Sequence, residues 1–164
     1  MRYNLKVQYI IDGHNLIPHI HGLSLSDPED ESKLLELLNR FQRVRHASIT
    51  VFFDRAPIGM QGVRRYGSVR AVFVPTGKTA DTAIVEALAR NKSAARSITL
   101  VSSDRQVQAA GRERRATVIS SSQFSKNLDE ALAELPSISN NDLAVSTREI
   151  DEWLKLFSKP GDSD

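Results

Sequence analysis

Short apolar runs recur along the chain, and most of them end at a polar residue. Four runs rich in Val, Ile, Leu and Phe predict strands that are covered on both faces, because their apolar positions are nearly continuous. A fifth run also predicts a strand, although its pattern does not place it within the sheet. These runs occupy residues 7–11, 48–53, 97–103 and 116–119, and the fifth occupies residues 69–74.

Between the runs, apolar residues recur at helical spacing. Asp27 is expected to cap the first helix, with Pro28 at its first position and acids in its first turn. Its apolar stripe consists of Leu34, Leu37, Leu38, Phe41 and Val44. Further helices are predicted at about residues 79–91, from Asp104 to near Gly111, from near Ser122, and at about residues 147–157, where Ile150, Trp153, Leu154 and Phe157 form a docking face.

The alternation of strand and helix patterns predicts an α/β protein with a parallel sheet and helices on both faces. We expect residues 1–158 to form a single domain and residues 159–164 to form a disordered tail. No cysteine is present, which rules out disulfides and thiolate metal sites. The first apolar run ends at Asp12, too early for a signal peptide, and no run is long enough to span a bilayer. A cytoplasmic location is therefore expected.

Charge is distributed unevenly along the chain. Residues 40–115 contain fifteen Lys and Arg against five Asp and Glu, whereas the rest of the chain contains seven against fifteen. Solvated basic faces could account for part of this excess. The clustering of Arg64 with Arg65, and of Arg112 with Arg114 and Arg115, is typical of a surface that binds a phosphate backbone.

Three of the predicted strands end at an aspartate: Asp12, Asp54 and Asp104. A fourth aspartate, Asp81, opens a predicted helix. In a parallel sheet all four would lie along one edge, where α/β proteins bind their ligands. Each could instead cap the helix that follows it. As a set, they would repel strongly, since two unit charges 4 Å apart cost about 4 kcal/mol at an effective dielectric near 20. Oxygen ligands of this kind suit Mg²⁺ or Mn²⁺.

The segment after the first strand offers further candidates. Gly13 is expected to form a flexible loop that lets a polyanion approach the backbone. Asn15 could orient a water or a phosphate oxygen, or could act only as a turn residue. His14 is a weaker candidate, because none of the four histidines has zinc-ligand spacing. Glu86 could support the site from behind or be merely solvated.

A hydrolase acting on phosphodiesters is the function that this acid set favours, because hard cations activate water and stabilise the charge of phosphodiester cleavage. One alternative is a non-catalytic RNA- or ribosome-binding adaptor, although a phosphate binder gains nothing from four acids. Another is a phosphatase, but an aspartyl nucleophile usually has a second acid two residues later, where this chain has His14. The acids and late-strand lysine of a receiver domain are not evident. No Gly-x-Gly-x-x-Gly follows a strand, which argues against dinucleotide binding.

The same residues resemble the YacP-like family within the NYN branch of PIN-like nucleases. The matching segments are Ile10-Ile11-Asp12-Gly13-His14-Asn15-Leu16-Ile17, Val51-Phe52-Phe53-Asp54, Thr79-Ala80-Asp81-Thr82-Ala83-Ile84 and Val101-Ser102-Ser103-Asp104. The resemblance implies a Rossmann-like α/β/α sandwich with a mostly parallel sheet and a metal-dependent endoribonuclease that cuts single-stranded RNA. Some relatives act on messenger RNA in association with ribosomes, so the ribosome is an expected partner. The sequence carries no signal for an oligomeric state.

The resemblance also implies roles for individual residues. Asp12, Asn15, Asp81 and Asp104 are the expected catalytic residues, and Asp12, Asp81 and Asp104 the expected ligands of Mg²⁺ or Mn²⁺. Asp54 ranks below these ligands, because Arg55 follows it where the family commonly has glycine; His14 stands where an aromatic residue is frequent. Residues 59–70 predict a glycine-hinged loop or hairpin that contacts RNA. The expected RNA-binding residues are Arg55, Arg64, Arg65, Tyr66, Lys78 and Arg105.

Overall fold

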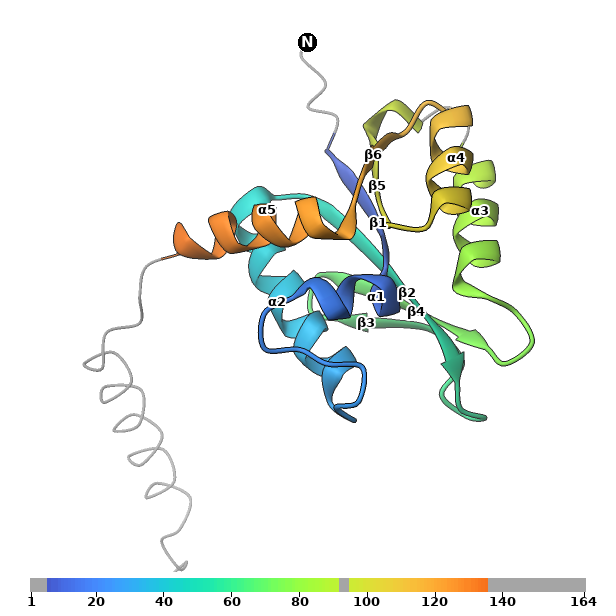
Figure 1. Ribbon diagram of the computed structural model, residues 1–164, viewed down its shortest axis with the longest axis horizontal. Helices are drawn as coiled ribbons and strands as arrows, with labels where there is room; N and C mark the ends of the chain where they lie inside the picture. Colours follow the sequence, from blue (N-terminus) through green and yellow to red (C-terminus); the bar gives the residue numbers. More distant parts are fainter. Residues whose placement is uncertain (1–5, 92–94, 136–164) are drawn as a thin grey trace, which may run out of the picture. The chain divides into compact units, whose positions relative to one another are not determined.

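The computed structural model describes residues 6–91 and 95–135, in which six strands form one sheet with helices on both faces (Figure 1). The strand order is β3-β4-β2-β1-β5-β6. Every neighbouring pair is parallel except β3 and β4, which are antiparallel. The strands are β1 (Gln8–Asp12), β2 (Ser48–Ala56), β3 (Gly62–Tyr66), β4 (Val69–Pro75), β5 (Ile98–Val101) and β6 (Thr117–Ile119).

The helices form the two outer layers. Apolar residues of α1, α2 and α5 pack on one face of the sheet, and those of α3 and α4 pack on the other. Two short 3₁₀ helices, η1 and η2, complete the elements of the described residues. Their bounds are α1 (Gly13–Leu16), η1 (Ile17–His19), α2 (Asp30–Arg45), α3 (Ala80–Arg90), η2 (Ala95–Ser97), α4 (Arg105–Glu113) and α5 (Ser121–Ala133).

The central strands are buried on both faces, as their continuous apolar runs predict. Ile10 packs with the α3 and α4 layer while its neighbour Ile11 packs with the α2 and α5 layer. Phe52 and Phe53 divide between the two layers in the same way. Burying each such side chain contributes about 1.5–3 kcal/mol. The predicted α/β architecture with a mostly parallel sheet is therefore confirmed, and residues 69–74 are placed beside β2.

Two predictions about local structure are wrong. Helix α2 begins at Asp30, three residues after the expected cap, because Asp27 instead accepts a hydrogen bond from the Glu29 amide in a preceding turn. The segment after Asp12 is not a loop but the helical turn α1. Gly13 is buried there, and a Cβ on it would lie 2.4 Å from the Phe53 ring. Glycine is thus required for close packing of α1 on β2, rather than for access by a polyanion.

Residues 62–75 form the hairpin that the glycine pattern allowed. Gly67, at φ +60°, and Ser68 make the turn between β3 and β4. The Asn39 side chain of α2 holds this turn, donating to the Tyr66 carbonyl at 2.8 Å and accepting from the Ser68 amide at 3.0 Å. This Asn39 clasp fixes an edge hairpin to the helix layer.

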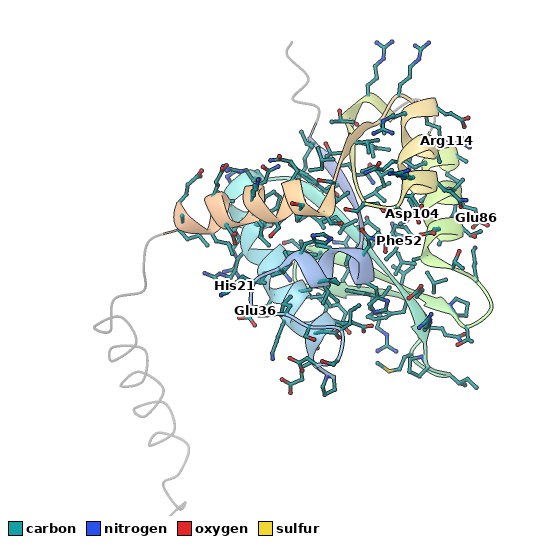
Figure 2. The ribbon with its side chains drawn as sticks, viewed as in Figure 1. His21, Glu36, Phe52, Glu86, Asp104 and Arg114 are labelled. Atoms are coloured by element: carbon teal, nitrogen blue, oxygen red, sulfur yellow. The ribbon has the colours of Figure 1, made fainter. Side chains whose placement is uncertain are left out.

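The remaining helices begin with capping side chains. Thr79 caps α3, Asp104 caps α4 (Figure 2) and Ser120 caps α5. Helix α4 continues two residues beyond the predicted end at Gly111. The helix predicted at residues 147–157 and the tail predicted at residues 159–164 lie outside the described residues. None of the helices described for residues 6–91 and 95–135 has the length and apolar character needed to cross a bilayer.

Candidate functional site

The four predicted aspartates lie along the carboxyl edge of the sheet. Asp12 is the last residue of β1, the strand that separates β2 from β5. Asp54 belongs to the end of β2, Asp104 follows β5, and Asp81 is in the first turn of α3. The helices that leave this edge beside β1 pack on opposite faces of the sheet. This arrangement makes the site a topological switch point, where doubly wound α/β folds bind their ligands.

Asp12 is the most buried of the four, with 6% of its surface exposed. Burial raises its pKa to about 6, and the charges of Asp81 and Asp54 add to that effect. The backbone N–H of Asn15 donates to the Asp12 carboxylate and partly offsets the rise in its pKa. The ionised form of Asp12 is therefore destabilised in the folded protein, and a nearby positive charge would offset that cost.

Asp81 and Asp104 complete an electrostatically coupled group with Asp12. Burial, followed by the charges of Asp104 and Asp54, raises the pKa of Asp81. The Asp104 carboxylate accepts hydrogen bonds through Oδ1 from the amides of Gln106 and Val107, at 2.9 and 3.0 Å. The capping role considered for Asp104 is thus present, and it occupies only one of the two carboxylate oxygens.

Asp54 lies in a different environment, because His14 bridges it to α2. The ring nitrogens of His14 lie 2.6 Å from Asp54 Oδ1 and 2.8 Å from Glu31 Oε1. The hydrogen bond to Glu31 is the largest cause that raises the His14 pKa to about 9, with the bond to Asp54 acting in the same direction. Both nitrogens therefore carry protons at neutral pH and donate. The His14 bridge gives Asp54 and Glu31 a positive neighbour.

Glu31 is a site residue that the sequence pattern missed. Its place in the first turn of α2 was visible, but that position alone indicates only a favourable interaction with the helix dipole. His14 was given low weight because no second ligand stood at metal-binding spacing. The contact between them depends on where α2 begins, which the sequence pattern placed two residues too early.

Asn15 ties three elements together at the same edge. Its Oδ1 accepts from the Ser103 amide at 2.8 Å and from the Ser121 hydroxyl at 2.7 Å. These bonds link α1 to the segment after β5 and to the start of α5. The role predicted for the Asn15 amide in orienting a water or phosphate remains a prediction. Because Oδ1 already accepts these two hydrogen bonds, the Nδ2 group would have to fill that role.

Arg55 has a backbone conformation that explains its position beside Asp54. It adopts φ +56° at a register shift between Phe53 and Ala56, where β2 bulges against β4. This left-handed region suits glycine, which costs no steric energy there, and costs other residues about 1–2 kcal/mol. The common family glycine at this position therefore has a conformational reason, and the Arg55 side chain is exposed.

The donor set fits a divalent cation in chemistry and charge. Asp12, Asp81 and Asp104 offer only hard oxygen ligands, and no Lys, Arg or His of the described residues forms an ion pair with them. Within residues 6–91 and 95–135, no three acidic or histidine side chains already converge as a ready-made metal cage. The observed arrangement is therefore a coupled acid cluster, and its ability to bind a cation remains a prediction.

The predicted RNA-binding residues are spread over the sheet. Arg64 stacks over Phe73 at 5.9 Å and donates to the Gly59 carbonyl. Tyr66 pairs with Val69 at the amino end of β4, four residues along the hairpin from Gly62. At about 3.4 Å per residue, Tyr66 lies roughly 14 Å and Arg65 roughly 10 Å from Gly62, the residue of β3 nearest the carboxyl edge of the sheet.

Two other basic candidates lie nearer the acids. Lys78 follows β4 and pairs with Glu86 of α3 at 2.5 Å, so Glu86 is an ion-pair partner rather than simply solvated. Arg105 is exposed at the first position of α4, directly after Asp104. Contact of any of these basic residues with RNA remains a prediction.

The comparisons with known proteins agree with this geometry. The sequence model of the YacP-like NYN domain matches residues 9–155. The chain is similar to the crystal structure of Rae1 (YacP) from Bacillus subtilis, with a TM-score of 0.68 and 20% identity, covering 92% of each chain. A tryptophan-to-leucine mutant of Rae1 gives a TM-score of 0.63 and 19% identity, covering 89% of this chain and 84% of that one. A search of the curated proteins gives no significant match.

The two kinds of likeness have different weight. At 19–20% identity, the solved structures establish a shared fold. The family match spans most of the chain and includes all four aspartates of the carboxyl edge. The chain therefore belongs to the YacP-like NYN domain family, a branch of the PIN-like nucleases.

Proposed function

We propose that this protein is a metal-dependent endoribonuclease that hydrolyses phosphodiester bonds of single-stranded RNA. The observation that supports this most is the charge imbalance at the carboxyl edge, where burial and mutual repulsion raise the pKa values of Asp12 and Asp81. Such a cluster costs free energy until a cation neutralises it. Membership in a family of PIN-like nucleases supports the same reaction class.

Asp12, Asp81 and Asp104 are the residues that would hold Mg²⁺ or Mn²⁺. Asp104 would use Oδ2, because its Oδ1 already accepts two backbone amides. A bound divalent cation supplies Lewis-acid activation of water and stabilisation of the charge on the scissile phosphate. Asp54 is held by the His14 bridge, so we assign it a supporting position rather than a primary ligand role.

Asn15 would act at the same edge by positioning. Its backbone N–H holds the Asp12 carboxylate, and its Oδ1 fixes the segment after β5 that leads to Asp104. Two acids from distant parts of the chain are therefore aligned through the backbone and the side chain of one residue. The free Nδ2 group would donate to a water or phosphate oxygen.

RNA is proposed as the substrate on the strength of the family resemblance and of the basic residues near the acids. Arg55, Lys78 and Arg105 would hold the phosphates on either side of the scissile bond. The same resemblance leads us to propose messenger RNA at the ribosome, in the cytoplasm, as the setting.

Incubating the purified full chain with three substrates tests the proposal. Single-stranded RNA, duplex DNA and a chromogenic phosphomonoester are each incubated with Mn²⁺ and with chelator. We expect internal cleavage of the single-stranded RNA with Mn²⁺ alone. RNA binding without cleavage would favour an adaptor, and turnover of the phosphomonoester alone would favour a phosphatase. Either result would overturn the nuclease proposal.

A further inference from the structure

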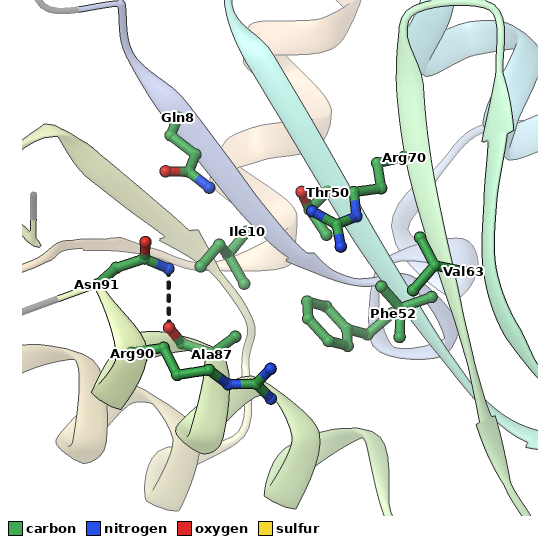
Figure 3. Close-up of a pocket in the computed structure, with 10 residues that line it drawn as sticks. Gln8, Ile10, Thr50, Phe52, Val63, Arg70, Ala87, Arg90 and Asn91 are labelled. Carbon is green, nitrogen blue, oxygen red and sulfur yellow. Dashed lines mark hydrogen bonds between the residues drawn. The ribbon is translucent and has the colours of Figure 1, made fainter.

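Among the elements described for residues 6–91 and 95–135, no helix covers the β3–β4 part of the sheet on the α3 side. Helices α3 and α4 pack over the middle of the sheet and its β5–β6 end, whereas β4 and β3 extend beyond them. Val63 of β3 is 53% exposed on this face. A pocket of about 360 Å³ lies between these strands and α3, and Figure 3 shows Arg70 and Arg90 reaching into it from β4 and α3.

This pocket continues into two others through shared lining residues. Towards the carboxyl edge, it shares Phe52, Val72 and Arg90 with a second hollow of about 380 Å³. Towards the amino edge, it shares Gln8, Thr50 and Arg70 with a third hollow, also of about 380 Å³. The three together, which we call the sheet groove, follow β4 from Ser68 to Pro75. At about 3.3 Å per residue, this path is roughly 23 Å long.

The charged side chains that line the sheet groove are predominantly basic. The single acid among them is Glu86, which pairs with Lys78 at 2.5 Å and with Arg90 at 3.8 Å. Arg70 forms no ion pair with any described residue, and its side chain is exposed. This imbalance is the complement of a polyanion. The basic residues that line the three hollows are Lys6, Arg65, Arg70, Lys78 and Arg90.

Uncharged lining residues add surfaces for bases. Val63 and Val72 add apolar surface to the lining of the middle hollow. Gln8 and Thr50 offer polar groups in the same hollow (Figure 3). Unpaired bases can pack against apolar or guanidinium surfaces, whereas the bases of a duplex are stacked on one another and hidden. The combination of cations with an apolar floor therefore suits a single strand.

The carboxyl end of the groove lies close to the acid edge. Its lining there includes Pro75, the last residue of β4, and Ala83, two residues after Asp81 on α3. A strand that follows the groove is thus delivered to the aspartates. An RNA strand along this path would also contact Arg65, which lies beside the hairpin turn at the amino edge of the sheet, far from the acids.

We propose that the sheet groove binds the sugar-phosphate backbone of single-stranded RNA and guides it to the carboxyl edge. The proposal rests on the proposed function, since it assigns the path of that substrate. Arg70 and Arg90 are the central contacts, because both project into the middle hollow.

The test measures binding of a fluorescent single-stranded RNA to the full chain in chelator, which prevents cleavage. The double variant Arg70→Ala/Arg90→Ala is compared with Arg40→Ala/Arg43→Ala, which removes the same charge from exposed positions on α2, on the opposite face. We expect the groove variant to weaken binding about tenfold or more and to flatten the slope of log Kd against log salt by about 1.4, because each of the two lost phosphate contacts contributes about 0.7. The α2 variant should change both quantities little.

Two results would overturn the proposal. One is an equal loss of affinity in the two double variants, both folded by circular dichroism. The other is an equal loss for duplex RNA of the same length, which would make the groove a general polyanion surface. Hydrolysis of a small activated phosphodiester with Mn²⁺ separates this question from the proposed function. Groove variants should retain that hydrolysis, whereas its absence in the wild type would count against the nuclease and leave the affinity comparison valid.

Discussion

The carboxyl edge contains two acidic regions that differ in their counter-charge. On the α2 side, Asp54 and Glu31 share the His14 imidazolium, which lies within 2.8 Å of both. On the α3 and α4 side, Asp12, Asp81 and Asp104 form no ion pair with a described residue, and the His14 charge is only the smallest influence on the Asp12 pKa. The chain itself supplies a positive charge to the first region, and we propose that an external cation supplies one to the second. Residue type alone does not distinguish these roles, because all but one of the five acids are aspartates.

Cleavage activity should separate the two regions most strongly. Asp12→Asn or Asp81→Asn is expected to lower the rate of RNA cleavage by more than about 100-fold, because each would remove a proposed direct metal ligand. Asp54→Asn should cost only about 10–100-fold, the usual effect of losing an indirect partner of a metal site. Single-turnover rates with Mn²⁺ measure the difference, with the exposed Asp129→Asn on α5 as the control. Equal losses at Asp12 and Asp54 would remove the distinction.

Asp12→Asn should lower activity but raise the stability of the metal-free protein. The folded pKa of Asp12 is about 6, above its ordinary value of 3.8. Below about pH 4, Asp12 is protonated in both the folded and the unfolded protein and costs no stability. As pH rises from there through 6, the free energy of unfolding falls by about 3 kcal/mol, at 1.36 kcal/mol per pKa unit. Asp12→Asn should raise the free energy of unfolding at pH 7 by about that amount in chelator. Urea unfolding between pH 4 and 8 tests this, and a loss of stability in the variant would contradict it.

The His14 bridge should show a smaller effect with its own pH range. The folded pKa of His14 is about 9, above the ordinary 6.5, so its contribution is complete below pH 6.5 and is lost as pH rises through 9. Allowing for solvent screening of these partly exposed groups, it amounts to about 2 kcal/mol. His14→Gln should therefore be less stable than wild type at pH 6.5 and nearly equal at pH 10. His21→Gln, at an exposed position, should match wild type throughout.

The sequence predicted those features that depend on local pattern. Apolar runs such as residues 48–53 identified the strands, because a strand buried on both faces needs continuous apolar residues. Aspartates at the ends of these runs could be assigned to one edge, because parallel strands share their direction. Three of the four acids of the candidate site were found in this way, and the fourth, Asp81, was found at the start of a predicted helix.

Features that depend on tertiary contact could not be predicted. The His14 bridge contacts Glu31, which lies 17 positions from His14 in the sequence, and Asp54, which lies 40 positions away. Its geometry depends on where α2 begins. Gly13 was interpreted from its backbone freedom, whereas the Phe53 ring packed against it explains why no side chain fits. Arg65 and Tyr66 lie beside the hairpin turn, at the amino edge of the sheet. This position follows from the register of β3 on β4, which a loop or hairpin pattern in the sequence leaves open.

The Asn39 clasp has a consequence for how copies of this protein behave at high concentration. β3 is an edge strand, and unpaired backbone groups on such a strand can template sheet extension by another chain. The clasp fixes the hairpin turn, and glycines at 62 and 67 bound the strand to five residues. Arg64 and Arg65 lie within it, so two edges brought together would crowd four guanidinium groups. The strand that borders the sheet groove is therefore protected against self-association by its shortness and its charge.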